Sequence, residues 1–213
     1  MYIKSRKELE IILSTLKGFR RPKESLEQWQ TPSDIAAVML FEALLRKDIK
    51  NKIVIDLGSG TGVLALGAAL LGAKKVYGVE IDAEAISVAM ENLSYLETIY
   101  GKLPVEFICC DVNEFSIRGD SVVMNPPFGL KKASRHADLF FLSRAFSLAK
   151  KIYSLHHYSE KSRKFLSRYA SVHNFSAELL GTFKFPLKAK LEKHKKPVKH
   201  ILVDFYYYQI MEK

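Results

Sequence analysis

The sequence predicts an α/β fold of the Rossmann-like type, with a seven-stranded, mostly parallel sheet and helices on both of its faces. Short apolar runs alternate with helical periodicities from residue 53 onward, and a glycine-rich loop joins the first run to the first of these helices. Acidic or amide side chains lie in or directly after four of the runs. Because parallel strands end at one edge of a sheet, these polar side chains should meet in a single crevice.

The elements are expected in the following order. Helices at residues 4–17 and 34–47 form an N-terminal helical extension over residues 1–50. The next strands and helices alternate, at 53–57, 62–72, 75–80, 83–97, 105–110 and 121–125. The remainder is expected as a helix, a strand, a basic helix and two last strands, at 138–148, 150–155, 159–171, 176–185 and 198–210. No repeat or linker indicates a second domain, so residues 1–213 are expected to form a single domain.

Composition narrows the class of protein. The 213 residues are 48% hydrophobic and 11% aromatic, as in globular proteins, and no apolar run is long enough to suggest a membrane span. The first residues alternate charged and apolar side chains, unlike a secretory signal, so we expect a cytoplasmic protein with no membrane partner. The two cysteines, Cys109 and Cys110, are adjacent on a predicted strand, which suits buried thiols and neither a metal cage nor a disulfide framework.

Positive charge is concentrated in the last third of the chain. The net charge is +10 overall, with +2 in residues 1–150 and +9 in residues 151–200. A basic surface of this size favours a polyanion such as nucleic acid, although a solvated lysine-rich surface explains the charge equally well. The lysines predict a basic loop between the last two strands, built from Lys184, Lys188, Lys190, Lys193, Lys195, Lys196 and Lys199.

The loop after the first strand has the pattern G-x-G-x-G, with Gly58, Gly60 and Gly62, and follows Asp56. Glycines let a backbone turn sharply and let a ligand approach closely, while the next helix begins with unpaired N–H groups. A nicotinamide-type G-x-G-x-x-G loop would need glycine at Val63. The pattern resembles the S-adenosylmethionine site of class I methyltransferases, so Asp56, Gly58, Gly60 and Gly62 are expected to bind that cofactor. A simple glycine-rich connection is the alternative.

Two further acids lie at the ends of the second and third strands. Glu80 follows Gly58 by 22 residues, an interval at which an acid accepts hydrogen bonds from ribose hydroxyls. Asp111 can accept from an adenine amino group, and the neighbouring N–H, at Val112, can donate to the ring. Capping of a helix or turn is the alternative role for this aspartate.

The fourth strand delivers Asn125-Pro126-Pro127-Phe128 to the same edge. Asn125 offers a carbonyl acceptor, and the two prolines hold the backbone in a stiff turn without N–H groups. Phe128 adds a flat apolar ring. This combination suits an amino group attached to a planar ring, whereas the plainer interpretation is a tight turn that ends a strand.

Taken in order, several motifs resemble methyltransferase-like protein five and its archaeal relatives. The motifs are Glu27-Gln28…Thr31-Pro32, Asp56 to Leu64, Glu80-Ile81-Asp82, Cys110-Asp111-Val112, Asn125 to Gly129 and Tyr153-Ser154-Leu155-His156. The resemblance implies a class I methyltransferase that uses S-adenosylmethionine to methylate N6 of an adenosine in small-subunit ribosomal RNA. It also implies cofactor contacts at Gln28, Thr31, Gly58, Thr61, Val63, Glu80, Asp111 and Val112. Eukaryotic members of that family depend on a small zinc-binding activator subunit.

The expected mechanism follows from the poor nucleophilicity of the adenine amine. The Asn125 oxygen and the Pro126 carbonyl are expected to accept one N6–H each, which localises the nitrogen lone pair. Phe128 is expected to stack on the flipped base, and Lys131, Lys132 and Arg135 to hold flanking phosphates. We assign no catalytic role to His136 or His156 and expect no metal ligands.

Three alternatives keep the fold and change the function. A related Asn-Pro-Pro-Tyr motif occurs in protein glutamine methyltransferases, in which a primary amide replaces the base amine. DNA adenine methylation is a nearer competitor. A non-catalytic RNA-binding ribosome-assembly factor that retains a cofactor pocket is the third alternative, although the intact acids and Asn125 argue against it.

Overall fold

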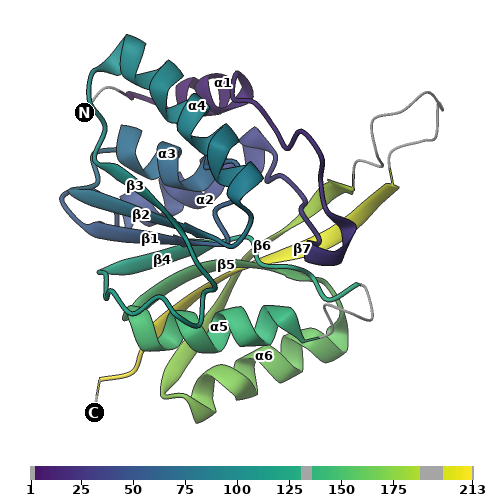
Figure 1. Ribbon diagram of the computed structural model, residues 1–213. Helices are drawn as coiled ribbons and strands as arrows, with labels where there is room; N and C mark the ends of the chain where they lie inside the picture. The colour runs from purple at the N-terminus through teal and green to yellow at the C-terminus, as the bar shows by residue number, and fades with distance from the viewer. Residues whose placement is uncertain (1–2, 131–135, 188–198, 213) are drawn as a thin grey trace.

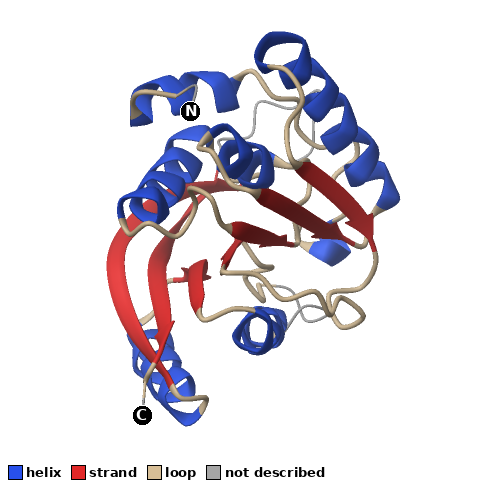
Figure 2. Ribbon diagram, turned by 90° about the vertical axis from the view of Figure 1, so that its left-hand side faces the viewer, coloured by secondary structure: helices blue, strands red, loops and turns tan. Residues whose placement is uncertain are grey.

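The computed structural model describes residues 3–130, 136–187 and 199–212. Its centre is one seven-stranded sheet with the strand order β3-β2-β1-β4-β5-β7-β6 (Figures 1 and 2). The strands are β1 (Ile53–Leu57), β2 (Lys75–Glu80), β3 (Val105–Cys109), β4 (Ser121–Met124), β5 (Lys151–His157), β6 (Phe175–Leu187) and β7 (Lys199–Ile210). Strands β1 to β5 pair in parallel, and β7 runs antiparallel to both of its neighbours.

Helices cover both faces of this sheet (Figure 1). One face carries α1 (Arg6–Ser14), α2 (Ser33–Leu45), α3 (Val63–Leu70) and α4 (Ala83–Tyr100), and the other carries α5 (Ala137–Leu148) and α6 (Glu160–Val172). A short 3-10 helix, η1 (Glu24–Leu26), lies between α1 and α2. The expected fold class is therefore confirmed. Among the described residues, no helix has the length and apolar character needed to cross a membrane.

Local sequence explains where the helices begin. The Asp82 carboxylate accepts a hydrogen bond from the Glu84 N–H at 3.1 Å at the start of α4, and the Ser159 hydroxyl accepts from the Ser162 N–H at 2.9 Å at the start of α6. Gly101 ends α4 with a φ of 76°, a value that favours glycine. These short-range contacts fix where α4 and α6 begin and where α4 ends.

Two apolar cores fill the layers above and below the sheet. Helices α1 to α4 cover the first core, in which α3 is buried along its whole length, and α5 and α6 cover the second. Helix α3 has no polar face, so the sequence Val63–Leu70 is suited to a position between the sheet and the two N-terminal helices. Burial of α3 holds the glycine loop against the sheet edge.

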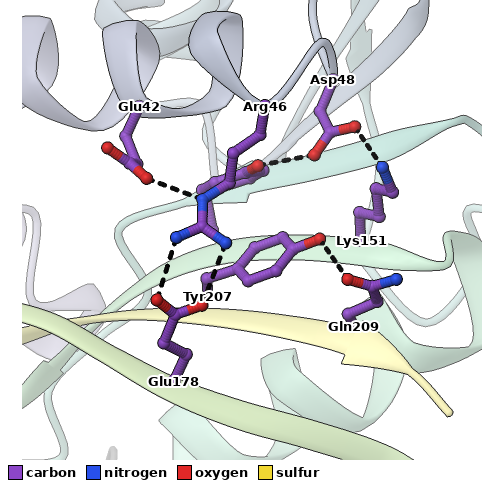
Figure 3. Close-up of polar contacts among 8 residues, drawn as sticks. Glu42, Arg46, Asp48, Lys151, Glu178, Tyr207 and Gln209 are labelled. Carbon is purple, nitrogen blue, oxygen red and sulfur yellow. Dashed lines mark hydrogen bonds and ion pairs between the residues drawn. The ribbon is translucent and has the colours of Figure 1, made fainter.

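A polar network joins the N-terminal helices to the C-terminal strands (Figure 3). Arg46 donates to both carboxylate oxygens of Glu178 at 2.9 and 3.0 Å, and its guanidinium lies 4.4 Å from the centre of the Tyr207 ring. The buried Asp48 accepts from Lys151 and from the Tyr153 hydroxyl, both at 2.6 Å. Residues 46–48 are thus connected to β5, β6 and β7.

One expectation is wrong, and two others concern residues outside the described ranges. Cys109 is exposed and Cys110 is half-buried, because β3 is an edge strand, so the prediction of two buried thiols is wrong. The loop containing Lys131, Lys132 and Arg135 falls outside the described residues. The same holds for most of the expected basic loop, namely Lys188, Lys190, Lys193, Lys195 and Lys196.

Candidate active site

The carboxyl ends of β1 to β4 surround a cavity of about 260 Å³. The sequence-predicted residues that line it are Gln28, Gly58, Gly60, Glu80, Asp111, Val112, Asn125 and Pro127. A smaller cavity of about 30 Å³ shares part of this wall and is lined by Thr31, Asp56, Thr61 and Val63. Of the predicted site residues, Gly62, Pro126 and Phe128 line neither cavity. The strand ends do converge as expected, because the sheet is parallel across this region.

The glycine loop leaves no room for side chains at its three glycines. Gly58 and Gly60 have φ values of 72° and 52°. A Cβ atom at Gly58 would lie 2.9 Å from the Phe141 ring, and one at Gly60 would lie 2.7 Å from the Phe19 ring. Gly62, with a φ of 87°, precedes α3 and packs against Phe107. The structure therefore assigns Gly62 to the start of the helix and its packing rather than to the cavity wall.

Glu80 binds the glycine loop through one oxygen and the chain beyond β2 through the other. Its carboxylate accepts from the Gly60 N–H and from the Asp82 N–H, each at 2.9 Å. Burial raises the pKa of Glu80, which is 7% exposed, while these backbone donors oppose that rise. Each carboxylate oxygen has a second lone pair, so Glu80 can also accept from ribose hydroxyls in the cavity.

Asp56 supports the loop from beneath. Its carboxylate is 1% exposed and accepts from the Ala65 N–H at 2.9 Å, which ties the end of β1 to the first turn of α3. Desolvation raises the pKa of Asp56 to about 8, and the Glu80 charge adds to the rise. The position of Asp56 matches a structural support better than the direct cofactor contact predicted from the sequence.

Unpartnered hydroxyls remain beside the loop. In the described structure, the buried Oγ of Ser59 and Oγ1 of Thr61 have no hydrogen-bond partner. Buried polar groups are nearly always paired, so such groups need an explanation. Ser59 lines the smaller cavity but was not predicted as a site residue, because sequence patterns mark the glycines around it and not its own side chain.

Asp111 and Val112 form the wall on the side of β3. One Asp111 oxygen accepts from the Asn113 N–H at 2.8 Å, which closes a tight turn, and no described residue donates to the other oxygen. The Val112 carbonyl accepts from Arg144 of α5 at 3.3 Å. The turn role expected as an alternative for Asp111 is therefore present, and Asp111 also lines the cavity with one oxygen that has no described donor.

The amide of Asn125 is held in one orientation. Its Nδ2 donates to the Trp29 carbonyl and to the Thr31 hydroxyl, both at 3.1 Å. A backbone carbonyl can only accept, so the NH₂ group must point toward Trp29, and Oδ1 must point the other way. This oxygen is buried and has no partner among the described residues. Thr31 thus orients Asn125, in addition to lining the smaller cavity.

Gln28 and Lys23 attach the segment around η1 to the site. Gln28 Nε2 and Lys23 Nζ each donate to a different oxygen of Asp82, both at 2.7 Å. Burial alone would raise the pKa of Asp82, but the hydrogen bonds from Lys23, Gln28 and the Glu84 N–H outweigh it and lower the pKa. Gln28 therefore lines the cavity while its amide is bound to protein.

Phe128 does not offer a free ring. It is 5% exposed and meets the Phe185 ring edge-on, with centroids 5.2 Å apart and planes at 85°. Phe185 lies in β6, 57 positions later in the chain, so nothing local in the sequence could reveal this contact. The expectation that Phe128 stacks on a base is not met in this structure.

The cavity instead has aromatic walls that the sequence analysis missed. Phe19, Trp29, Phe140 and Phe141 all line it. Phe140 and Phe141 were expected only as residues of the helix at 138–148, and no motif marked Phe19. Their signal is tertiary, because α5 and the segment before η1 both pack against the glycine loop. His156 is fully buried, with Nδ1 3.7 Å from Asp138 and the Tyr206 and Tyr208 rings beside it.

The residues present fit S-adenosylmethionine. Gly58 and Gly60 give close access to backbone, Glu80 and Asp111 supply acceptors for ribose and amino groups, and unpartnered hydroxyls lie nearby. No group of three or more potential metal ligands occurs among the described residues. A parallel sheet with this loop and these acids defines a class I S-adenosylmethionine-dependent methyltransferase.

Comparisons with known proteins agree with this assignment to the methyltransferases. The chain is 37% identical over 206 residues to the zebrafish (Danio rerio) rRNA N(6)-adenosine-methyltransferase METTL5, covering 93% of this chain and 96% of the relative. It is 35% identical over 212 residues to the Drosophila melanogaster Mettl5 protein, covering 96% of each. The chain belongs to the METTL5 family of rRNA N6-adenosine-methyltransferases, and its cofactor is S-adenosyl-L-methionine.

Two further matches concern the archaeal relatives and the cofactor domain. The crystal structure of PH1948 from Pyrococcus horikoshii, described as a candidate RNA methyltransferase, is 40% identical and superposes with a TM-score of 0.86 over 98% of both chains. The family model for Ribosomal protein L11 methyltransferase (PrmA) matches residues 36–125. That match covers the glycine loop, the acids and Asn125, and it ends before Pro126.

Proposed function

We propose that this chain methylates N6 of an adenosine in ribosomal RNA of the small subunit. The observation that carries the proposal is the Asn125 carboxamide, whose NH₂ is bound to Trp29 and Thr31 and whose Oδ1 is buried without a described partner. A buried oxygen without a partner can accept a hydrogen bond from a bound substrate. The relatives are named as rRNA N6-adenosine-methyltransferases. We therefore take the hydrogen-bond donor to be the N6 amine of the target adenine.

The residues of the site act on the nucleotide by holding its amine. Asn125 Oδ1 accepts one N6–H and the Pro126 carbonyl accepts the other, which draws the nitrogen lone pair out of the ring system and aims it along one direction. The bound cofactor supplies an electrophilic methyl group. Fixed dipoles cost no reorganisation during the reaction, so positioning contributes most of the acceleration. The aromatic walls exclude water and offer flat surfaces to the base.

The side chains around the cofactor have separate tasks. In this proposal, Glu80 binds the ribose hydroxyls of the cofactor, and Asp111 and the Val112 N–H bind its adenine. The backbone from Gly58 to Gly60 lies against the remaining part of the cofactor. Thr31 orients Asn125 by accepting a hydrogen bond from its amide, and Gln28 donates a hydrogen bond to Asp82. Residues 1–213 work as one methyltransferase domain, with residues 1–50 as a helical extension that supplies Trp29 and Thr31.

The direct test replaces Asn125 with Ala. Methyl transfer to ribosomal RNA should be lost, while cofactor affinity, measured by calorimetry, should stay near that of the wild type because the Glu80 contacts are intact. Asn113→Ala, which removes an exposed asparagine side chain beside the site, serves as the matched control and should keep full turnover. Normal turnover by Asn125→Ala on rRNA would contradict the proposed polarisation.

The substrate class has its own experiment. Labelled methyl groups offered with total RNA, DNA and protein fractions should appear in RNA, and mapping of modified adenosines in rRNA from cells that lack this protein should reveal one missing site in the small subunit. Label in protein glutamine or in DNA would favour the alternatives from the sequence analysis. Cofactor binding without label in any fraction would favour a non-catalytic assembly factor.

We further propose, from the family resemblance, a small zinc-binding activator subunit at the β3 edge of the sheet. Strand β3 pairs only with β2 among the described strands, so its other edge offers unpaired backbone groups. Tyr95 and Ile99 of the adjacent α4 are 46% and 55% exposed, four residues apart on one helix face. Co-expression with such a subunit should raise Tm, and Ile99→Glu should cancel the gain. No gain for the wild-type chain would contradict this proposal.

A further inference from the structure

Helix α6 carries an exposed phenylalanine that is held in place by a column of rings. Phe165 is 47% exposed, and its ring stacks on Tyr169 with centroids 5.6 Å apart and planes at 21°. Tyr169 stacks in turn on Phe146 of α5 at 6.4 Å, and Phe146 stacks on the buried Phe175 of β6 at 4.2 Å. Core packing therefore sets the orientation of a ring that remains partly open to solvent.

Cations lie around this ring on the exposed side of α6. Lys161 and Arg168 are four residues before and three residues after Phe165, spacings that place side chains on one helix face, and Lys164 directly precedes Phe165 in the sequence. All three residues are exposed, and none forms a hydrogen bond or ion pair with another described residue. The single acid of α6, Glu160, lies in the first turn and accepts from the Tyr158 hydroxyl at 3.0 Å.

The position of this surface relates it to the active site. Strand β5 ends at His157, at the carboxyl edge of the parallel sheet, and α6 begins at Glu160 (Figure 1). Phe165 is five residues further, about 8 Å along the axis at a rise of about 1.5 Å per residue. Arg163 belongs to the inner side of the helix, because it binds Asp204 at 2.8 and 2.9 Å. The ring and its cations therefore lie on the outer side of a helix that begins at the same edge of the sheet as the strand ends that form the cavity.

We propose that Phe165, Lys161, Lys164 and Arg168 form a docking platform for a single-stranded segment of the RNA substrate, outside the catalytic cavity. The proposal rests on the proposed function, which supplies the RNA. An unpaired base stacks on the open side of the Phe165 ring, and the cations neutralise the phosphates on either side. A duplex hides the faces of its bases within its own stack, so the platform selects unpaired RNA.

The test measures RNA binding rather than turnover. Phe165→Ala should weaken binding of a labelled single-stranded rRNA fragment by about 5- to 160-fold, the usual range for one base stacked on one aromatic ring. Phe165→Leu keeps an apolar side chain but removes the ring, and it should weaken RNA binding similarly. This variant is the control for misfolding caused by loss of the apolar side chain. Val172→Ala is the matched control, because Val172 is an apolar residue of the same helix that is 77% exposed, and it should bind as the wild type does.

Salt dependence tests the cations separately. Removal of Lys161 and Arg168 together should reduce the slope of log affinity against log salt by about 0.7 per cation. Wild-type affinity in both Phe165 variants, or equal competition by a blunt duplex, would overturn the platform.

A different result would contradict the proposed function, namely the absence of methyl transfer to RNA by the wild-type chain. A minimal RNA that contains only the target and its neighbours should be methylated by Phe165→Ala at the wild-type kcat.

Discussion

At the scale of single residues, the orientation of Asn125 depends on Thr31. Thr31→Val keeps the side-chain shape but removes the acceptor for one amide hydrogen. Because the amide is then held only by the Trp29 carbonyl, we expect kcat to fall about tenfold, the effect of roughly one hydrogen bond, with the cofactor Kd little changed. Thr31→Ser keeps the hydroxyl and should restore most of the activity. A weaker cofactor Kd at unchanged kcat would instead make Thr31 a cofactor contact, as the sequence predicted.

Asp56 makes the stability of the fold depend on pH. Its pKa in the folded chain is about 8, above the ordinary value of 3.8, so the folded state retains a proton that the unfolded state releases. The stability contributed by this proton is present at low pH and is lost as pH rises from about 4 to about 8. Asp56→Asn, which keeps an oxygen for the Ala65 N–H, should flatten the decline of Tm between pH 5 and pH 8. An unchanged decline would show that Asp56 ionises normally.

At the scale of elements, the glycine loop is the most restricted turn of the site. Gly60→Ala would place a Cβ 2.7 Å from the Phe19 ring at a φ of 52°. We expect the loop and Phe19 to move apart and the cofactor affinity, measured by calorimetry, to fall about tenfold or more. Gly72→Ala is the control, since Gly72 has a φ of 90° but only an ordinary contact of 3.7 Å with Lys50. Equal losses in both variants would assign the effect to backbone strain rather than to crowding.

The strands were predicted well because their signals are local. Strands β1 and β2 have the expected bounds, and the other five lie within about three residues of them. Helix α4 continues three residues beyond the expected end, to Tyr100, because Gly101 rather than the preceding polar residues ends it. The order β5-β7-β6 could not be deduced from periodicity, since it depends on how two distant strands pair.

At the scale of the whole molecule, Asp48 joins the end of the N-terminal helical region to the sheet. Asp48→Ala would leave the Tyr153 hydroxyl buried without its acceptor and remove the ion-pair partner of Lys151. Loss of one partner from a buried charged group typically costs about 3–5 kcal/mol, so we expect a large decrease in the free energy of unfolding in urea. Lys7→Ala, which breaks an exposed pair with Glu10, should change it by about 1 kcal/mol or less. Similar values for both variants would show that the network is not structural.

The sequence by itself determined the class of fold, the edge of the sheet that carries the site, and the residues that close each strand there, because alternation of side chains and turn chemistry are properties of neighbouring residues. Only the tertiary structure decided how those residues are used. Trp29 and Thr31 aim the Asn125 oxygen, Phe185 buries the Phe128 ring, and Phe19 and Phe141 cover the glycine loop. These contacts join segments far apart in the chain, and close packing of distant side chains leaves no local pattern in a sequence.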